Sequence, residues 1–169
     1  MKIIDCTTFF QEKLMMEVRF NILDPYVDKF LVCEANFTHS GNQKSINFDI
    51  NNYPDFKKKI VHIVLEKEPD YINKIQNERL KSIKRIECQR NYLINGLKDF
   101  SKEDLIIYSD NDEIPNLKKL DKNIIKNKII LFEQDLFYYK FNLFLKDHFW
   151  YGSKACRLKD LINIDWLRM

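Results

Sequence analysis

Apolar segments of strand length alternate with segments of helical periodicity along this 169-residue chain, and this order constrains the fold more than any other feature. The strand-like segments are residues 2–10, 29–35, 59–65, 105–108, 128–133 and 137–145. The helix-like segments are residues 12–23, 73–100 and 116–126. Strands that are separated by helices favour parallel pairing, because a parallel connection must return to the other end of the sheet. We therefore predict an α/β fold with a mainly parallel central sheet flanked by helices.

Burial patterns are visible in three of these segments. Residues 29–35 are apolar enough to be covered on both faces of a sheet. In the first helix, the predicted buried stripe consists of Leu14, Met15, Val18 and Ile22. In the long helix, it consists of Ile83, Ile86, Leu93 and Leu97. Arg90 falls in the same stripe, and a guanidinium that faces a core is costly unless it is paired. We expect Arg90 to reach Asp110 or a ligand phosphate; the alternative is a structural carboxylate or solvent at the edge of the stripe.

Composition excludes several classes of protein. Hydrophobic residues make up 45% of the chain, which excludes a disordered protein. The net charge is only +3 and the basic residues are dispersed, so we expect no nucleic-acid partner. Because no apolar run reaches about 18 residues, we also expect no membrane span.

The four cysteines stand far apart and form no C-x-x-C pair, which argues against a disulfide framework or a zinc site. Cys6 and Cys33 lie in apolar runs and are predicted to be buried. The chain does not open with a basic and apolar leader, so a cytoplasmic location is expected by default. An exported parent that has lost its leader is the alternative.

A carboxylate-rich turn follows the apolar segment at residues 105–108 and reads SDNDEIP. Side chains two apart in extended backbone point the same way, so Asp110 and Asp112 can converge on one cation. Oxygen ligands select Mg²⁺ or Mn²⁺. The chain has no glycine-rich phosphate loop, so any phosphate must be neutralised by such an ion and by basic side chains. From spacing alone, a merely solvated charged turn is an equally good interpretation.

Several segments, taken in order, resemble glycosyltransferase family 17, the β-1,4-mannosyl-glycoprotein β-1,4-N-acetylglucosaminyltransferases and their relatives. The matching segments are KIIDCTTFFQEKLMMEVRFNILDPYVDKFLVCEANFTHSG, KIVHIVL, CQRN and SDNDEIPN, and they span residues 2 to 116. A looser match includes Tyr138, Tyr139, Trp150, Tyr151 and Gly152.

The resemblance implies a Rossmann-type GT-A fold, with residues 1–169 as a single catalytic domain. Residues 1–116 are then the donor-binding part, and residues 117–169 begin the acceptor part. Relatives generally continue further, so we expect acceptor-side elements to be missing at the C-terminal end. The animal members also carry a membrane anchor, which this sequence does not show.

The resemblance further implies metal-assisted transfer of a sugar, expected to be N-acetylglucosamine, from a UDP donor to a hydroxyl of a saccharide or glycoprotein-glycan acceptor, with inversion. Asp110 and Asp112 match the D-x-D motif, which holds Mn²⁺ or Mg²⁺ against the diphosphate. The residues expected to bind the nucleotide sugar are Thr7, Glu34, Arg90, Asn91 and Asp110. The candidate general bases are Glu113, Glu133 and Asp135.

Five late aromatic residues are further candidates for saccharide binding, although we expect most of them to be in the core: Tyr138, Tyr139, Phe149, Trp150 and Tyr151. Two other functions stay open. The chain could bind a nucleotide sugar or act as a scaffold without turnover. It could also be a non-enzymatic, basic α/β binding module.

Overall fold

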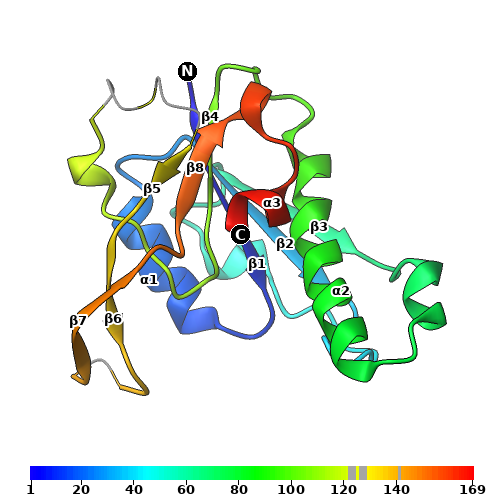
Figure 1. Ribbon diagram of the computed structural model, residues 1–169. Helices are drawn as coiled ribbons and strands as arrows, with labels where there is room; N and C mark the ends of the chain where they lie inside the picture. The colour runs from blue at the N-terminus through cyan, green and yellow to red at the C-terminus, as the bar shows by residue number, and fades with distance from the viewer. Residues whose placement is uncertain (122–124, 126–128, 141) are drawn as a thin grey trace.

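A six-stranded sheet with the order β3-β2-β1-β4-β8-β5 forms the centre of the protein (Figure 1). The structure is a computed structural model, and it describes residues 1–121, 125, 129–140 and 142–169. The parallel strands are β1 (Ile3–Phe9), β2 (Lys29–Ala35), β3 (Ile60–Leu65) and β4 (Leu105–Tyr108). β8 (Lys154–Arg157) lies antiparallel to both β4 and β5 (Ile130–Leu131). The predicted α/β class with a mainly parallel sheet is confirmed.

Helices cover both faces of this sheet, as β2 illustrates. Phe30 and Val32 pack in one buried core with side chains of α1 (Lys13–Leu23). Leu31 and Cys33 point to the opposite face, where the second core includes residues of η3 (Leu93–Leu97) and α3 (Ile164–Arg168). η3 continues from α2 (Glu78–Tyr92), and Figure 1 shows α1 and α2 on opposite sides of the sheet. The prediction that residues 29–35 are covered on both faces is confirmed, as is the burial of Cys6 and Cys33.

A second, two-stranded sheet stands apart from the central one. β6 (Gln134–Phe137) and β7 (Phe144–Trp150) pair antiparallel and form a hairpin that projects from the body (Figure 1). The remaining elements are short 3-10 turns: η1 (Ile50–Asn52), η2 (Asp70–Lys74), η4 (Leu117–Lys119) and η6 (Leu158–Asp160). In the described part of the chain, no helix combines the length and the apolar character that crossing a membrane requires.

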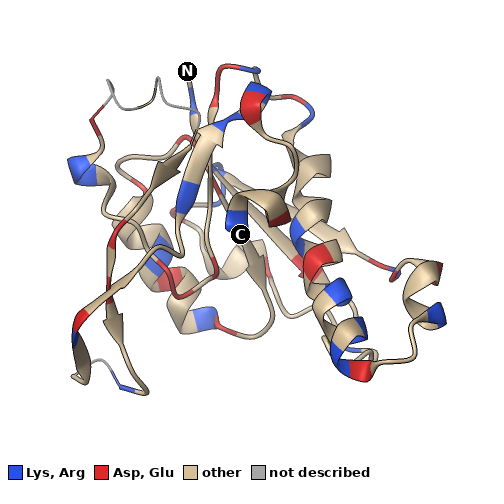
Figure 2. Ribbon diagram, viewed as in Figure 1, with Lys and Arg blue, Asp and Glu red and all other residues tan. Residues whose placement is uncertain are grey.

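Charges of both signs are interspersed over the elements, and α2 carries both (Figure 2). Along this helix, Lys81 pairs with Glu78 and Lys84 pairs with Glu87. Pairs three residues apart stabilise an exposed helix face. They help to explain how so polar a sequence forms four turns of helix at the surface.

Four predicted elements differ from the structure. Of the strand predicted at residues 128–133, β5 covers only Ile130–Leu131, and residue 128 lies outside the described part. The helix predicted at residues 73–100 begins only at Glu78, where the Asn77 side chain caps it, and it passes into a 3-10 turn after Tyr92. The helix predicted at residues 116–126 is represented by the η4 turn; residues 122–124 and 126–128 lie outside the described part. The strand predicted at residues 137–145 is interrupted: Phe137 ends β6 and Phe144 begins β7, and Tyr139 between them has a left-handed backbone with φ of 61°. Residue 141 lies outside the described part. The strand β8 and the helix α3 were not predicted.

The buried face of α1 is also not the predicted one. Leu14 is 70% exposed, and Val18 and Ile22 are exposed as well. The buried residues of the helix are Met16, Arg19, Phe20 and Leu23. Arg19 decides between the two faces, because its guanidinium pairs with the buried carboxylate of Asp5 on β1. The sequence analysis missed this pair.

The predicted stripe of the long helix is only partly right. Leu93 and Leu97 are buried, but Ile83 is 48% exposed. The polar side chains of Arg85 and Gln89 are buried in its place. Arg85 pairs with Glu68, and Gln89 donates hydrogen bonds to the carbonyl oxygens of Phe9 and Cys33. These partners explain how the helix can turn a polar face inward.

Candidate functional site

The buried side chain of Arg19 fixes the turn that follows β4. The guanidinium of Arg19 donates to both carboxylate oxygens of Asp5, at 2.8 and 2.6 Å, and to the Ser109 hydroxyl at 2.7 Å. Its Nη1 also donates to the carbonyl oxygens of Asp110, Asn111 and Glu113, at 3.2, 3.3 and 3.0 Å. Burial opposes the charge of Arg19, but the Asp5 carboxylate outweighs it, and the pKa of Arg19 is raised. The backbone of residues 109–113 is therefore held in one conformation.

The Asp110 carboxylate lies at the centre of a charged network. It accepts hydrogen bonds from the Tyr108 hydroxyl at 2.9 Å, from Arg90 Nη2 at 3.3 Å and from Arg168 Nη2 at 3.0 Å. Burial would raise the pKa of Asp110, but Arg90 and Arg168 lower it overall. Arg90 also donates to Tyr108 and to Asp165 of α3. The predicted pairing of Arg90 with Asp110 is present, and Arg168 adds a second guanidinium.

Glu113 ties the turn to the C-terminal elements. Its carboxylate accepts hydrogen bonds from the Asp110 backbone N–H at 3.0 Å, from Trp150 Nε1 at 2.5 Å and from Arg168 Nη2 at 2.9 Å. Gly152 makes this approach possible, since a Cβ at that position would overlap the Glu113 carboxylate. Both oxygens of Glu113 are thus engaged in holding the structure together.

A cavity of about 450 Å³ opens at the carboxyl ends of the parallel strands, and we call it the edge cavity. Thr8 of β1 and His39 of the loop after β2 line it, together with Arg90 of α2. The turn after β4 contributes Asp110, Asn111 and Asp112. Burial lowers the pKa of His39, so this histidine favours its neutral form. The edge cavity is where an open parallel sheet binds its ligand.

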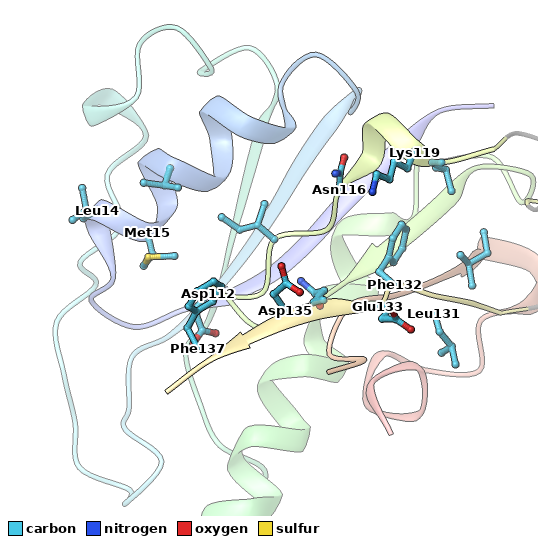
Figure 3. Close-up of a pocket in the computed structure, with 15 residues that line it drawn as sticks. Leu14, Met15, Asp112, Asn116, Lys119, Leu131, Phe132, Glu133, Asp135 and Phe137 are labelled. Carbon is cyan, nitrogen blue, oxygen red and sulfur yellow. The ribbon is translucent and has the colours of Figure 1, made fainter. Parts of the chain in front are cut away.

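A larger cavity of about 870 Å³ lies beside α1, and we call it the α1 cavity. Leu14 and Met15 project into it from α1, opposite Glu133 and Asp135 of the segment around β6 (Figure 3). Three of the four apolar α1 residues that were predicted to be in the core, Leu14, Met15 and Val18, thus form one wall of a cavity. Asp112 lines the α1 cavity as well as the edge cavity.

The late aromatic residues are exposed, so the expectation that most of them are in the core is wrong. Phe149, Trp150 and Tyr151 line a third cavity of about 550 Å³ together with Arg90 and Arg168. Tyr138 and Tyr139 lie at the hairpin turn, and Tyr139 is 88% exposed. Phe149 and Trp150 lie on β7, which pairs only with β6 among the described strands, so the hairpin is not part of the central sheet.

Three residues that the sequence analysis assigned to nucleotide-sugar binding lie behind the edge cavity. The buried Thr7 donates its hydroxyl hydrogen to the Ser109 carbonyl at 2.9 Å, and its neighbour Thr8 lines the cavity instead. The buried Glu34 accepts hydrogen bonds from Lys44 Nζ and from two backbone N–H groups, so it orders the loop after β2. The Asn91 side chain accepts the backbone N–H of Asp165 at 2.9 Å and thereby anchors α3.

Sequence reasoning missed Arg19, Asn111 and Arg168. Arg19 had a signal, since it stands between Met16 and Phe20 at helical spacing, just as Arg90 stands in its own apolar stripe. Asn111 lies within the carboxylate-rich turn, but nothing in the sequence indicates that its amide is buried without a partner. Arg168 had no signal, because its position depends on β8 and α3, which bring residue 168 back to residue 110.

The donor set around the turn decides whether a divalent ion fits. Within the described residues, no group of three or more His, Cys, Asp or Glu side chains could hold a metal ion. Asp112 is exposed and its carboxylate is open, whereas the oxygens of Asp110 are shared with two arginines. Mg²⁺ and similar ions commonly bind one or two carboxylates and take their other ligands from water and substrate phosphates. The residues therefore fit an ion that binds together with a phosphate-bearing ligand.

Comparison with known families agrees with this geometry. The family model described as glycosyltransferase family 17 matches residues 1–160 of the chain. No curated protein sequence matches it. The mainly parallel six-stranded sheet flanked by helices is consistent with the GT-A-like fold that the sequence predicted.

Proposed function

Because the chain belongs to glycosyltransferase family 17, we propose that it transfers N-acetylglucosamine from UDP-N-acetylglucosamine to a hydroxyl of a saccharide or glycoprotein-glycan acceptor, with inversion at the anomeric carbon. One observation carries the proposal: Asp112 lines both the edge cavity and the α1 cavity. A donor in the edge cavity and an acceptor in the α1 cavity would meet at this residue. This assigns donor binding mainly to residues 1–116 and acceptor binding to residues that follow.

The donor side of the proposal rests on charge. Arg90 and Arg168 flank Asp110, and guanidinium groups bind phosphate oxygens through paired hydrogen bonds. Asp112, with Asp110 beside it, would hold Mn²⁺ or Mg²⁺. When bound, the ion supplies Lewis-acid stabilisation of the diphosphate leaving group. Thr7 and Glu34 support this site indirectly, through the Ser109 carbonyl and the loop after β2.

The acceptor side needs a general base. In an inverting transfer the acceptor hydroxyl oxygen bonds to the anomeric carbon, the bond to the UDP oxygen breaks, and a carboxylate takes the hydroxyl proton. Glu113 is committed to the turn, and Glu133 accepts a hydrogen bond from the Tyr151 hydroxyl at 2.9 Å. Within the described residues, the Asp135 side chain has neither a hydrogen bond nor an ion pair, and it lines the α1 cavity. We therefore assign the base to Asp135, with Glu133 as the second candidate.

Donor binding is tested by calorimetry with UDP-N-acetylglucosamine in the presence and absence of Mn²⁺. With Mn²⁺ present, we expect the unchanged chain to bind the donor and the Asp112→Asn variant not to bind it. An ion that has only one or two protein ligands is not retained when one of these ligands is removed. Asp55→Asn serves as the control, since Asp55 is an exposed aspartate that lines none of the three cavities. Equal Mn²⁺-dependent binding by the Asp112→Asn variant would refute the D-x-D assignment.

Turnover is tested with mannose-containing acceptors by following UDP release and product mass. We expect Asp135→Asn to bind the donor normally and to lose transfer by roughly 10²- to 10⁴-fold, the usual contribution of a general base. Glu133→Gln is the matched variant, and we expect a smaller loss from it. A larger loss from Glu133→Gln would move the base to that residue. UDP release without a glycoside product would favour the alternative of a donor-binding protein that does not transfer.

A further inference from the structure

Asn111 lines the edge cavity, and its side-chain amide is unsatisfied. The residue is 7% exposed, and neither its Oδ1 nor its Nδ2 has a hydrogen-bond partner. Over the described residues, four buried side-chain nitrogen or oxygen atoms lack a partner, and two of the four belong to Asn111. A buried polar group without a hydrogen bond is costly, so native proteins retain one mainly where a ligand or water meets it. The orphaned amide therefore marks a point of contact in the edge cavity.

The amide cannot easily turn away to find a partner in the protein. The Asn111 carbonyl accepts a hydrogen bond from Arg19 Nη1 at 3.3 Å, which fixes the backbone that carries the side chain. The preceding residue, Asp110, is held by Arg90 and Arg168. The other amide in the cavity, that of Gln89, already donates to the carbonyl oxygens of Phe9 and Cys33. Asn111 is thus held at the wall of the edge cavity, with an amide that no protein group satisfies.

The chemistry of the amide limits what it can bind. Phosphate oxygens only accept hydrogen bonds, so a diphosphate would satisfy Nδ2 and leave Oδ1 without a donor. A metal ion would satisfy Oδ1 alone. A hydroxyl group both donates and accepts, and it can satisfy both ends of the amide. The imide edge of uracil does so too, but it lies one ring further from the diphosphate, which is proposed to lie beside Asp110 and Asp112, whereas the hydroxyls of the ribose and of the transferred sugar flank that diphosphate. We propose that Asn111 binds a neutral hydroxyl group of the sugar-nucleotide donor, on the ribose or on the transferred sugar, and so contributes to donor selectivity. The proposal rests on the proposed function, because it requires such a donor in the edge cavity.

The substitution Asn111→Leu tests it, since leucine has nearly the same size and no polar atom. Without ligand, we expect the thermal midpoint to rise by about 2–4 °C, because an orphaned amide has been removed. With Mn²⁺, we expect the affinity for UDP-N-acetylglucosamine to fall by roughly 5- to 100-fold. Asn95→Leu is the control, because Asn95 is exposed and lines none of the three cavities. It should change neither quantity.

Two further ligands identify which hydroxyl is bound. If the contact is to the ribose, Asn111→Leu also weakens binding of UDP, and it has no effect on a deoxyribose analogue that lacks the contacted hydroxyl. If the contact is to the transferred sugar, the affinity for UDP is unchanged and only that for UDP-N-acetylglucosamine falls.

Other outcomes overturn the proposal. Equal donor affinity of Asn111→Leu and the unchanged chain would mean that the amide meets only water, while the proposed function still stands. A lower thermal midpoint without ligand would mean that Asn111 has a structural role. If the unchanged chain binds no UDP-N-acetylglucosamine in the presence of Mn²⁺, both this proposal and the proposed function fail.

Discussion

The turn after β4 and the β6–β7 hairpin both border the α1 cavity, but the protein holds their backbones and neighbouring side chains in different ways. In the turn, residues 109–113 are fixed by the buried Arg19, and the carboxylates of Asp110 and Glu113 are each bound by several donors. In the hairpin, most side chains face solvent, and Asp135 has no partner among the described residues. The turn is therefore ordered before a ligand binds, whereas the hairpin presents exposed side chains to the solvent.

This difference separates two tasks in a transferase. Groups that stabilise a charged leaving group work best when they are already oriented, because no reorganisation is then needed during the reaction. The turn meets that requirement. Side chains that contact an acceptor can be ordered by the acceptor itself, at some cost in affinity. We interpret the exposed hairpin as the adaptable side of the site, where acceptor selection takes place.

Of the substitutions that test this contrast, we expect the loss of Arg19 to have the largest effect on the free energy of unfolding. We expect Arg19→Met to lower the free energy of unfolding by about 3–5 kcal/mol, because it leaves the Asp5 carboxylate buried and unpaired. Arg19→Lys should lose less, since it keeps the charge but cannot bind Asp5 and three carbonyl oxygens at once. Urea denaturation followed by circular dichroism measures both.

The hairpin supplies the matched control for that measurement. Tyr139→Ser removes a whole aromatic ring from the surface. We nevertheless expect it to change the free energy of unfolding by less than about 0.5 kcal/mol, because the residue is exposed. An exposed arginine of α2 gives a second control in Arg79→Met. If Arg19→Met were no more destabilising than these controls, the turn would not depend on its buried arginine, and the contrast with the hairpin would fail.

The regions also differ in how far sequence could predict them. Long apolar runs predicted the parallel strands well, because burial on both faces leaves a strong compositional signal. Asp110, Asp112 and Arg90 were predicted to lie together, and Arg90 does contact Asp110. Arg90 could be inferred because a guanidinium in an apolar stripe needs a partner, and its helix leads into the strand that ends before Asp110.

Features that are decided by tertiary packing escaped prediction. α1 has two stripes with apolar residues, and only the pairing of Arg19 with Asp5 decides which one is buried. The hairpin turn uses Tyr139 with positive φ, where a glycine or asparagine would have been the usual signal. Arg168 reaches Asp110 from 58 residues away, over a four-residue strand and a five-residue helix. Each case depends on tertiary packing that no window of sequence contains.

A smaller expected effect is the pH dependence of stability that arises from Asp110 in the turn. The pKa of Asp110 in the folded protein lies below its ordinary value: burial opposes ionisation, but Arg90 and Arg168 favour it more. The folded state therefore binds this proton less readily than the unfolded state does. The stabilising contribution of Asp110 should be complete above its unfolded pKa of about 3.9 and should be lost as the pH falls through the lowered folded pKa.

Asp110→Asn isolates this contribution. At pH 7 we expect the variant to be less stable by about 1–3 kcal/mol, which is less than the loss from Arg19→Met. The loss is limited because Arg90 keeps Asp165 and Arg168 keeps Glu113 as partners. Urea unfolding from pH 7 to pH 3, at constant ionic strength, should show the difference between the two proteins shrinking below about pH 4. Titrating groups that contact neither Arg90 nor Arg168 affect both proteins alike. A difference that stayed constant over this range would show that the charge of Asp110 does not stabilise the turn.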